Sequence, residues 1–248
     1  ELKNDMDAIG QLSYLTNDLW ALGNPLQNNF KAIFMLSGIW PNNHELTSSE
    51  ESILFDYIES GGSVYMEDGD IWFNSFDSSI RDLFNCYGIE DGDGDISIIK
   101  GLEGTFASGY LSEYNGENNW IDRLGILSSA FPLIINSDPE YAISVAYDGG
   151  SYRTIASSFE YGGLESSSNR QDLLLSILNF LDNGGMPDWM PGDVNQDNEL
   201  DIMDVIIMVD FILETYQPLP VQYWCSNINQ DSGIDLIDIV MIISIILE

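Results

Sequence analysis

Apolar residues in the first third of the chain switch between the spacing of strands and the spacing of a helix. Residues 31–38 form an apolar run that ends in glycine, which is typical of a strand buried on both faces, and residues 63–67 predict the next strand. Between them, Thr47 and Glu50 have the spacing of a capping box, and apolar residues recur at helical intervals up to Gly61. This order predicts a strand–helix–strand unit.

The alternation continues to residue 183. Residues 80–87 predict a short helix, and residues 169–181 predict a long closing helix with a leucine-rich apolar stripe. Residues 141–147 and 152–159 predict two neighbouring strands, joined at residues 148–150 by a glycine turn of the hairpin type. We therefore expect an α/β fold with a doubly wound, mostly parallel sheet that is covered by helices.

The pattern changes near residue 185. Residues 185–191 contain two prolines and a glycine, which predicts a linker after an α/β domain of residues 1–184. Residues 192–248 contain an internal repeat, in which 193–204 and 227–238 align at a constant offset of 34 residues. An apolar helix is predicted after each copy, so this part is expected to be a small all-α domain of two loop–helix units.

Each copy of the repeat has the ligand spacing of a calcium loop. Oxygen-bearing side chains stand at loop positions 1, 3, 5, 9 and 12, and an aliphatic residue stands at position 8. This spacing curls six or more oxygens around one point, while position 7 offers its carbonyl. The alternative is a pair of acidic helix N-termini without metal, but carboxylates gathered so densely would repel one another. The sequence therefore predicts two calcium ions.

Residues 192–248 resemble a dockerin, or a dockerin-like calcium module of secreted bacterial or archaeal proteins. The resemblance implies a first ion held by side chains or, at Glu199, by a carbonyl: Asp193, Asn195, Asp197, Glu199, Asp201 and Asp204. It implies a second ion held in the same way, with the carbonyl from Gly233: Asn227, Asn229, Asp231, Gly233, Asp235 and Asp238. Two departures stand out. Asn198 and Ser232 replace the usual glycine of loop position 6, and the second loop begins with an amide, so we expect the second site to be weaker.

Dockerins bind cohesin modules through residues around loop positions 10 and 11. In this chain those positions are Ile202, Met203, Leu236 and Ile237. The resemblance implies an apolar surface, duplicated by the repeat, for a cohesin-like module or for self-assembly. The alternative is that these side chains pack on the α/β domain or on the other helix.

The first domain resembles class I glutamine-amidotransferase-like domains, which have a flavodoxin-like fold. The resemblance rests on residues 34–38, 46–67 and 156–160, with Arg170 and the closing helix, and it spans about residues 1–183. Catalytic members carry a cysteine at the elbow that corresponds to residues 65–70, and none is present there. We therefore expect the domain to be non-catalytic.

The sequence gives weaker support to other kinds of catalytic site. Cys86 is expected in the core, and His44 is expected in an exposed loop without a nucleophile beside it. The alternative is a hydrolase whose carboxylates lie at the carboxyl ends of strands, at residues 67–70 and at Glu160. In that case Trp40, Trp72 and Tyr161 would form an aromatic platform for a sugar ring. Whether this hydrolase site exists depends on whether the side chains come together in the fold.

The chain begins at or inside the first helix of an amidotransferase-like domain. A missing central strand would leave unpaired backbone groups in the middle of the sheet, at about 1–3 kcal/mol each. A strand from a neighbouring subunit would fill the gap, or the chain would be the C-terminal fragment of a larger secreted peptidase. Both interpretations predict an incomplete sheet.

Charge narrows the classes of partner. Seven basic residues stand against 41 acidic ones, which gives a formal net charge of −34 and disfavours nucleic acid and anionic lipid. The apolar run at residues 239–247 is too short to span a bilayer. Asp91, Asp93 and Asp95 copy the start of a calcium loop, but loop position 12 would be Leu102, which cannot bind a metal, so a solvated turn is favoured over a third cation site. Cys86 and Cys225 form either one disulfide or two buried thiols. We expect a secreted or cell-surface protein that binds calcium and works in attachment or assembly.

Overall fold

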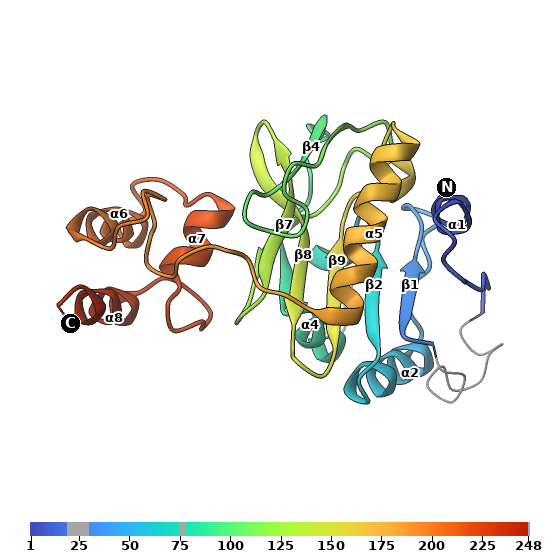
Figure 1. The fold of residues 1–248 in the computed structure, drawn as a ribbon, viewed down its shortest axis with the longest axis horizontal. Coiled ribbons are helices and arrows are strands. Elements are labelled where there is room, and N and C mark those ends of the chain that lie inside the picture. The colour runs from blue at the N-terminus through green and yellow to red at the C-terminus, as the bar shows by residue number, and fades with distance from the viewer. Residues whose placement is uncertain (19–29, 75–77, 248) are drawn as a thin grey trace.

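The computed structural model describes residues 1–18, 30–74 and 78–247. Within these ranges one seven-stranded sheet forms the centre of the molecule, and a two-stranded ladder lies beside it (Figure 1). In spatial order the large sheet contains β1 (Ala32–Leu36), β2 (Ser63–Glu67), β9 (Arg153–Ser157), β8 (Glu140–Asp148), β7 (Phe131–Ser137), β4 (Ile98–Gly101) and β5 (Leu111–Glu113). The small ladder pairs β3 (Cys86–Glu90) with β6 (Arg123–Ile126).

The α/β class is confirmed, but the sheet is parallel only in part. β1, β2 and β9 are parallel neighbours, whereas β8, β7, β4 and β5 continue the sheet through antiparallel pairings. The prediction of a mostly parallel sheet was therefore wrong. The cause is the length of the connections, because the short turns after β7 and β8 cannot hold a crossover helix and force antiparallel hairpins.

Helices cover both faces of the parallel half. α2 (Ser48–Glu59) begins at the predicted capping box of Thr47 and Glu50 and packs beside α4 (Ser78–Phe84). α5 (Ser167–Asn183) contacts β2 and β9, and α1 (Leu2–Ala8) packs on α5. Side chains of β2 alternate between the two resulting cores, with Val64 and Met66 in one and Tyr65 in the other.

The sheet has no central gap among the described residues. β1 pairs directly with β2 along its whole length, from Ala32 opposite Ser63 to Leu36 opposite Glu67, and β2 pairs directly with β9. The expected row of unpaired backbone groups is absent from this part of the sheet. A strand from a neighbouring subunit is therefore not needed there, because the α2 crossover places consecutive strands side by side.

The short helix predicted over residues 80–87 ends earlier. α4 ends at Phe84, and Cys86 is the first residue of β3 instead of lying on a helix. Cys86 is fully buried, as expected, and both Cys86 and Cys225 are free thiols. The disulfide alternative is therefore excluded.

The C-terminal region contains α6 (Ile202–Ile212), α7 (Pro220–Ser226) and α8 (Leu236–Ile246). Figure 1 shows α7 between the sheet and the α6–α8 pair, with the two chain termini at opposite ends of the molecule. Trp189 in the preceding irregular segment stacks edge-on against Trp224 of α7 at 5.4 Å, and its indole N–H donates to the Glu103 carbonyl at 2.7 Å. Apolar side chains of α6, α7 and α8 belong to the same core cluster as Leu124 and Ile126 of β6. The C-terminal region is thus packed on the α/β domain.

No helix among the described residues is long and apolar enough to cross a membrane.

Candidate functional site

Asp204 closes the first loop of the repeat. Its fully buried carboxylate accepts the backbone N–H groups of Val194 (2.8 Å) and Asn195 (3.2 Å) through Oδ1, and that of Asp201 (3.0 Å) through Oδ2. Asp204 lies in the first turn of α6, whereas its partners lie at the beginning and end of the loop. The position-12 side chain therefore folds the loop into a ring.

Other side-chain oxygens of the first loop accept backbone N–H groups in the same way. The carboxylate of Asp193 accepts the N–H groups of Asp197 (3.1 Å) and Asn198 (2.9 Å), and the amide oxygen of Asn195 also accepts the N–H of Asp197 (2.9 Å). Asp197 in turn accepts the N–H of Glu199 (2.9 Å). Asn198, at loop position 6, adopts a left-handed backbone with φ +65°, which asparagine tolerates well.

The second loop repeats this arrangement with its own residues. The buried carboxylate of Asp238 accepts the N–H groups of Asn229 (3.1 Å) and Asp235 (2.9 Å), as Asp204 does in the first loop. The amide oxygen of Asn227 accepts the N–H of Asp231 (3.2 Å), and Asp231 accepts that of Gly233 (3.0 Å). The 34-residue repeat in sequence is therefore a repeat in three dimensions.

The donor set of each loop suits a hard cation. Carboxylates, amide oxygens and a free carbonyl are the ligands that calcium prefers, and the loop positions agree with its usual order. Asp201 and Asp235 also cap α6 and α8, so each loop holds part of its shape without an ion. Within the described ranges, no group of three or more His, Cys, Asp and Glu side chains is arranged to hold a metal. The two calcium ions therefore stay a prediction.

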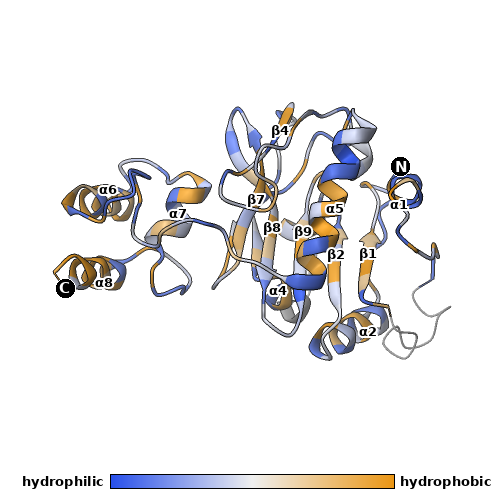
Figure 2. Cartoon of the chain, viewed as in Figure 1, coloured by the Kyte–Doolittle hydropathy of each residue, from blue (hydrophilic) through white to orange (hydrophobic). Residues whose placement is uncertain are grey.

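The four residues of the predicted partner surface are exposed. Ile202 is 61% exposed, Met203 50%, Leu236 68% and Ile237 56%. At least half of each of these residues therefore stays in contact with solvent. Further exposed aliphatic residues lie on the same helices, which Figure 2 shows as largely hydrophobic, or directly after α6: Ile206, Val209, Leu213, Val240, Ile243 and Ile245. The sequence analysis missed this extension, although nearly unbroken apolar composition over α6 and α8 signals it.

The carboxylates of the hydrolase alternative lie at the carboxyl ends of β2 and β9. Burial raises the pKa of Glu67 to about 7, and the charges of Glu160 and Asp68 add to this effect. Burial likewise raises the pKa of Asp68 to about 6. A further member, Asp122, was missed because it lies far away in sequence. Burial raises its pKa to about 7, with added repulsion from Asp70 and other carboxylates.

These carboxylates accept hydrogen bonds from the backbone around them. Glu67 accepts the N–H of Tyr161 at 3.0 Å, and Asp68 accepts the N–H of Asp70 at 2.9 Å. Glu160 accepts the N–H of Asn118 at 2.9 Å. None of them lines the hollows of about 50 and 450 Å³ that lie elsewhere on the described surface. Raised pKa values are therefore present, but the concave pocket that a hydrolase needs is not shown.

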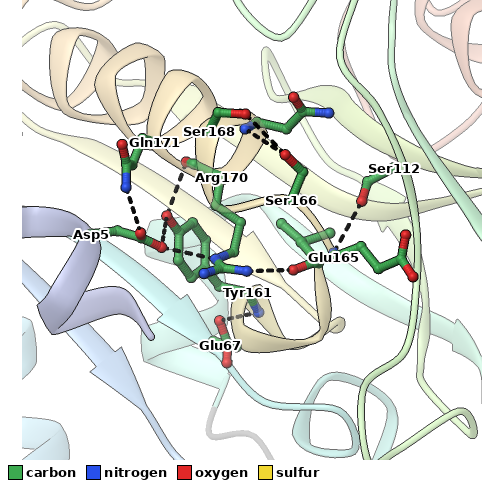
Figure 3. A network of polar contacts seen from close by, with 11 residues as sticks. Asp5, Glu67, Ser112, Tyr161, Glu165, Ser166, Ser168, Arg170 and Gln171 are labelled. Atoms are coloured by element: carbon green, nitrogen blue, oxygen red, sulfur yellow. Dashed lines mark hydrogen bonds and ion pairs between the residues drawn. The ribbon is translucent and has the colours of Figure 1, made fainter. Parts of the chain in front are cut away.

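The proposed sugar platform does not form. Trp72 is 1% exposed and donates its indole N–H to the Ser157 carbonyl, and Tyr161 is 2% exposed. The Tyr161 hydroxyl belongs to a buried clamp, in which Asp5 of α1 pairs with Arg170 of α5 at 2.8 Å (Figure 3). Burial alone would raise the pKa of Asp5. Hydrogen bonds from Gln171, Arg170 and Tyr161 outweigh this effect and bring the pKa below its ordinary value. Only Trp40 of the predicted platform is exposed.

Other candidate groups have structural partners. The His44 ring lies 2.9 Å from the Glu50 carboxylate and not beside a nucleophile, and burial raises the pKa of the Cys86 thiol. In the acidic turn before β4, Asp93 and Asp95 pair with the Arg123 guanidinium at 3.1 and 3.0 Å. The guanidinium of Arg123 therefore holds this turn, which neither a fully solvated turn nor a third cation site predicts.

No family model and no curated protein matches this chain. Among solved structures, the mmIFT52 N-terminal domain is similar at a TM-score of 0.51 and 12% identity, over 75% of this chain and 90% of that one. Gan42B, a GH42 β-galactosidase from G. stearothermophilus, has a TM-score of 0.45 and 12% identity, over 65% of this chain. A ThuA-like protein from Parabacteroides merdae has a TM-score of 0.45 and 12% identity, over 77% of this chain and 86% of that one. The chain matches only 22% of the length of the β-galactosidase, and the first similarity supports the α/β fold alone.

Proposed function

We propose that this chain is a calcium-dependent attachment protein of the secreted or cell-surface kind, with a dockerin-like C-terminal module on a non-catalytic α/β domain. The observation that carries the proposal is the exposure of one aliphatic pair in each repeat, Ile202–Met203 and Leu236–Ile237. Each pair follows a loop whose side-chain oxygens accept backbone N–H groups of the same loop. A cohesin-like module or a second copy of the chain would cover these pairs.

The position of the pairs supports a link between calcium and partner binding. Each pair stands in the first turn of its helix, directly after the N-cap aspartates Asp201 and Asp235. Those aspartates are also predicted ligands at loop position 9. An ion that orders the loop would therefore fix the orientation of the apolar pair that follows it.

The energetic argument favours burial of these side chains in a complex. Fully burying an aliphatic side chain contributes about 1.5–3 kcal/mol relative to leaving it in water. Four such side chains at equivalent positions offer a surface that a folded monomer leaves unused. The duplication also gives a partner two equivalent ways to bind.

The test is calcium-dependent binding to a purified cohesin module, with analytical ultracentrifugation of the chain alone for self-assembly. We expect one of the two associations in calcium and its loss in chelator. Replacing Ile202, Met203, Leu236 and Ile237 by alanine should abolish the association, while the exposed sheet residues Ile98 and Leu111 serve as matched alanine controls. Neither association in calcium, or one that survives the fourfold replacement, would contradict the proposal.

A hydrolase is the second candidate, favoured by the raised pKa of Glu67 beside Glu160. A carboxyl that is protonated near neutral pH can act as a general acid. The test is hydrolysis of glycoside and peptide substrates by the intact chain and by Glu67→Gln. Activity that Glu67→Gln removes would establish this candidate, and activity that it leaves intact would exclude Glu67.

A further inference from the structure

Three aromatic side chains are exposed near the carboxyl ends of β1 and β2. Trp40 follows β1 and is 70% exposed, and Phe73 lies on the short helix α3 (Ile71–Asn74) after β2 and is 45% exposed. Trp120 comes from the connection between β5 and β6 and is 57% exposed. Indoles that stay in water forfeit the free energy that their burial would provide, so a group of them marks a contact surface.

Asp70 brings the three aromatic residues to one place. The backbone N–H of Trp40 and the side-chain amide of Asn118 (3.4 Å) both donate to its carboxylate. Asp70 directly precedes α3, which carries Phe73. Asn118 accepts the backbone N–H of Trp120 at 2.9 Å. One carboxylate therefore connects three segments that lie far apart in the sequence.

The segment that carries Trp120 is held rigidly. Glu160 accepts the Asn118 N–H at 2.9 Å and the Tyr114 hydroxyl at 3.0 Å. Gly69 packs so closely on this segment that an added Cβ would lie 2.5 Å from the Asn118 side-chain amide. The segment of Trp120 is thus preformed, which reduces the entropy that a ligand must offset on binding there.

The polar groups at this edge select the chemistry of the ligand. Asp70 and Asn118 offer hydrogen-bond acceptors on the segments that carry the aromatic side chains, in a chain with a net charge of −34. An anion would be repelled, and a purely apolar protein surface would remove water from the half-buried Asp70 carboxylate without adding a donor to the two that it already has. Sugar hydroxyls supply donors without negative charge, while the C–H faces of sugar rings pack on indoles.

The open shape favours a chain over a single sugar. Small ligands are usually enclosed in a pocket, and these residues line neither of the hollows described above. Aromatic side chains spread over two loops and the short helix α3 suit an extended ligand that contacts several of them at once. We propose that this edge of the sheet binds a neutral polysaccharide, through Trp40, Phe73 and Trp120 with Asp70 and Asn118.

The proposal is tested by affinity electrophoresis and calorimetry of the full chain against soluble neutral mannan, xylan and hydroxyethyl cellulose. We expect at least one of them to bind, with Trp40→Ala and Trp120→Ala each lowering the affinity about tenfold. The double variant should not bind. Both side chains are mostly exposed, so these variants should keep the melting temperature and the circular dichroism of the parent chain.

Tyr216→Ala is the matched control, because Tyr216 is an exposed aromatic residue on the C-terminal region. This variant should bind like the parent chain, and chelator should leave the binding intact, since the surface belongs to the α/β domain. Binding to none of the polysaccharides would overturn the proposal, as would undiminished binding by the double variant. Binding to a polylysine peptide alone would show that the surface is an electrostatic one, and would also overturn it.

Discussion

Carboxylates gather at two places in this molecule, and the two are built in different ways. In the C-terminal loops, Asp204 and Asp238 accept only backbone N–H groups of their own loop, and the other oxygens follow at fixed spacing. At the edge of the sheet, Glu67 and Asp122 are brought together with distant carboxylates by the fold, and burial raises the pKa of both. We propose that a cation completes the first arrangement, whereas the raised pKa values indicate that protons neutralise the second.

Calcium removal should have the largest effect on stability. It should act on the C-terminal loops and leave the carboxylates at the end of the sheet unaffected. If each site is saturated about 100-fold above its dissociation constant, two ions contribute about 5 kcal/mol, which corresponds to roughly 10–20 °C in melting temperature. Melting curves in calcium and in chelator measure this. A shift of less than a few degrees would show that the loops hold their shape by helix capping alone.

Loss of the buried Asp5–Arg170 pair between α1 and α5 should have the next largest effect on stability. This effect should not depend on calcium. Asp5→Ala leaves the Arg170 guanidinium without its buried partner, and we expect a loss of about 3–5 kcal/mol in the free energy of unfolding. Asp7→Ala removes the exposed pair with Lys3 and should cost less than about 1 kcal/mol. Urea titrations in calcium and in chelator should give the same difference between the two variants.

The pH dependence should differ in sign between the two places. Glu67 and Asp122 have raised pKa values in the folded chain, so the folded state binds more protons than the unfolded state between about pH 4.5 and 7. In chelator, stability should therefore fall as the pH rises through this window, and Glu67→Gln should weaken the fall. The calcium contribution should change in the opposite direction, because its ligands bind the ion only when ionised. Melting temperatures at pH 5 and pH 7.5, with and without calcium, test both signs.

The exposed aliphatic pairs give the smallest effect on stability. Replacing Ile202 and Met203 by alanine removes little buried area, so the melting temperature in calcium should change by no more than about 2 °C. Met208→Ala, at a fully buried position of the same helix, should cost about 2–5 kcal/mol. Equal effects at the two positions would mean that the exposed pair packs against another part of the chain.

Features encoded by short-range spacing were predictable from the sequence. The capping box at Thr47, the hairpin turn after β8 and the three-dimensional repeat of the loops all involve residues within about one loop of each other. These features need only local backbone geometry, which the order of residue types determines.

Features that depend on distant contacts were not predictable. Asp122 joins the edge of the sheet because its N–H donates to the Gly69 carbonyl, a contact between segments 53 residues apart. The pairing of Arg123 with Asp93 and Asp95 likewise joins positions 30 and 28 residues apart. The direct pairing of β1 with β2 likewise follows from the crossover, and the composition of the two strands does not reveal it.

The most direct test of the account is a calorimetric calcium titration of the intact chain, compared with Asp204→Asn and Asp238→Asn. We predict two binding events in the parent chain, the weaker one lost in Asp238→Asn and the tighter one lost in Asp204→Asn. The reason is that the second loop begins with the neutral Asn227 where the first begins with Asp193. No binding of calcium, or binding that both variants retain in full, would contradict the central claim.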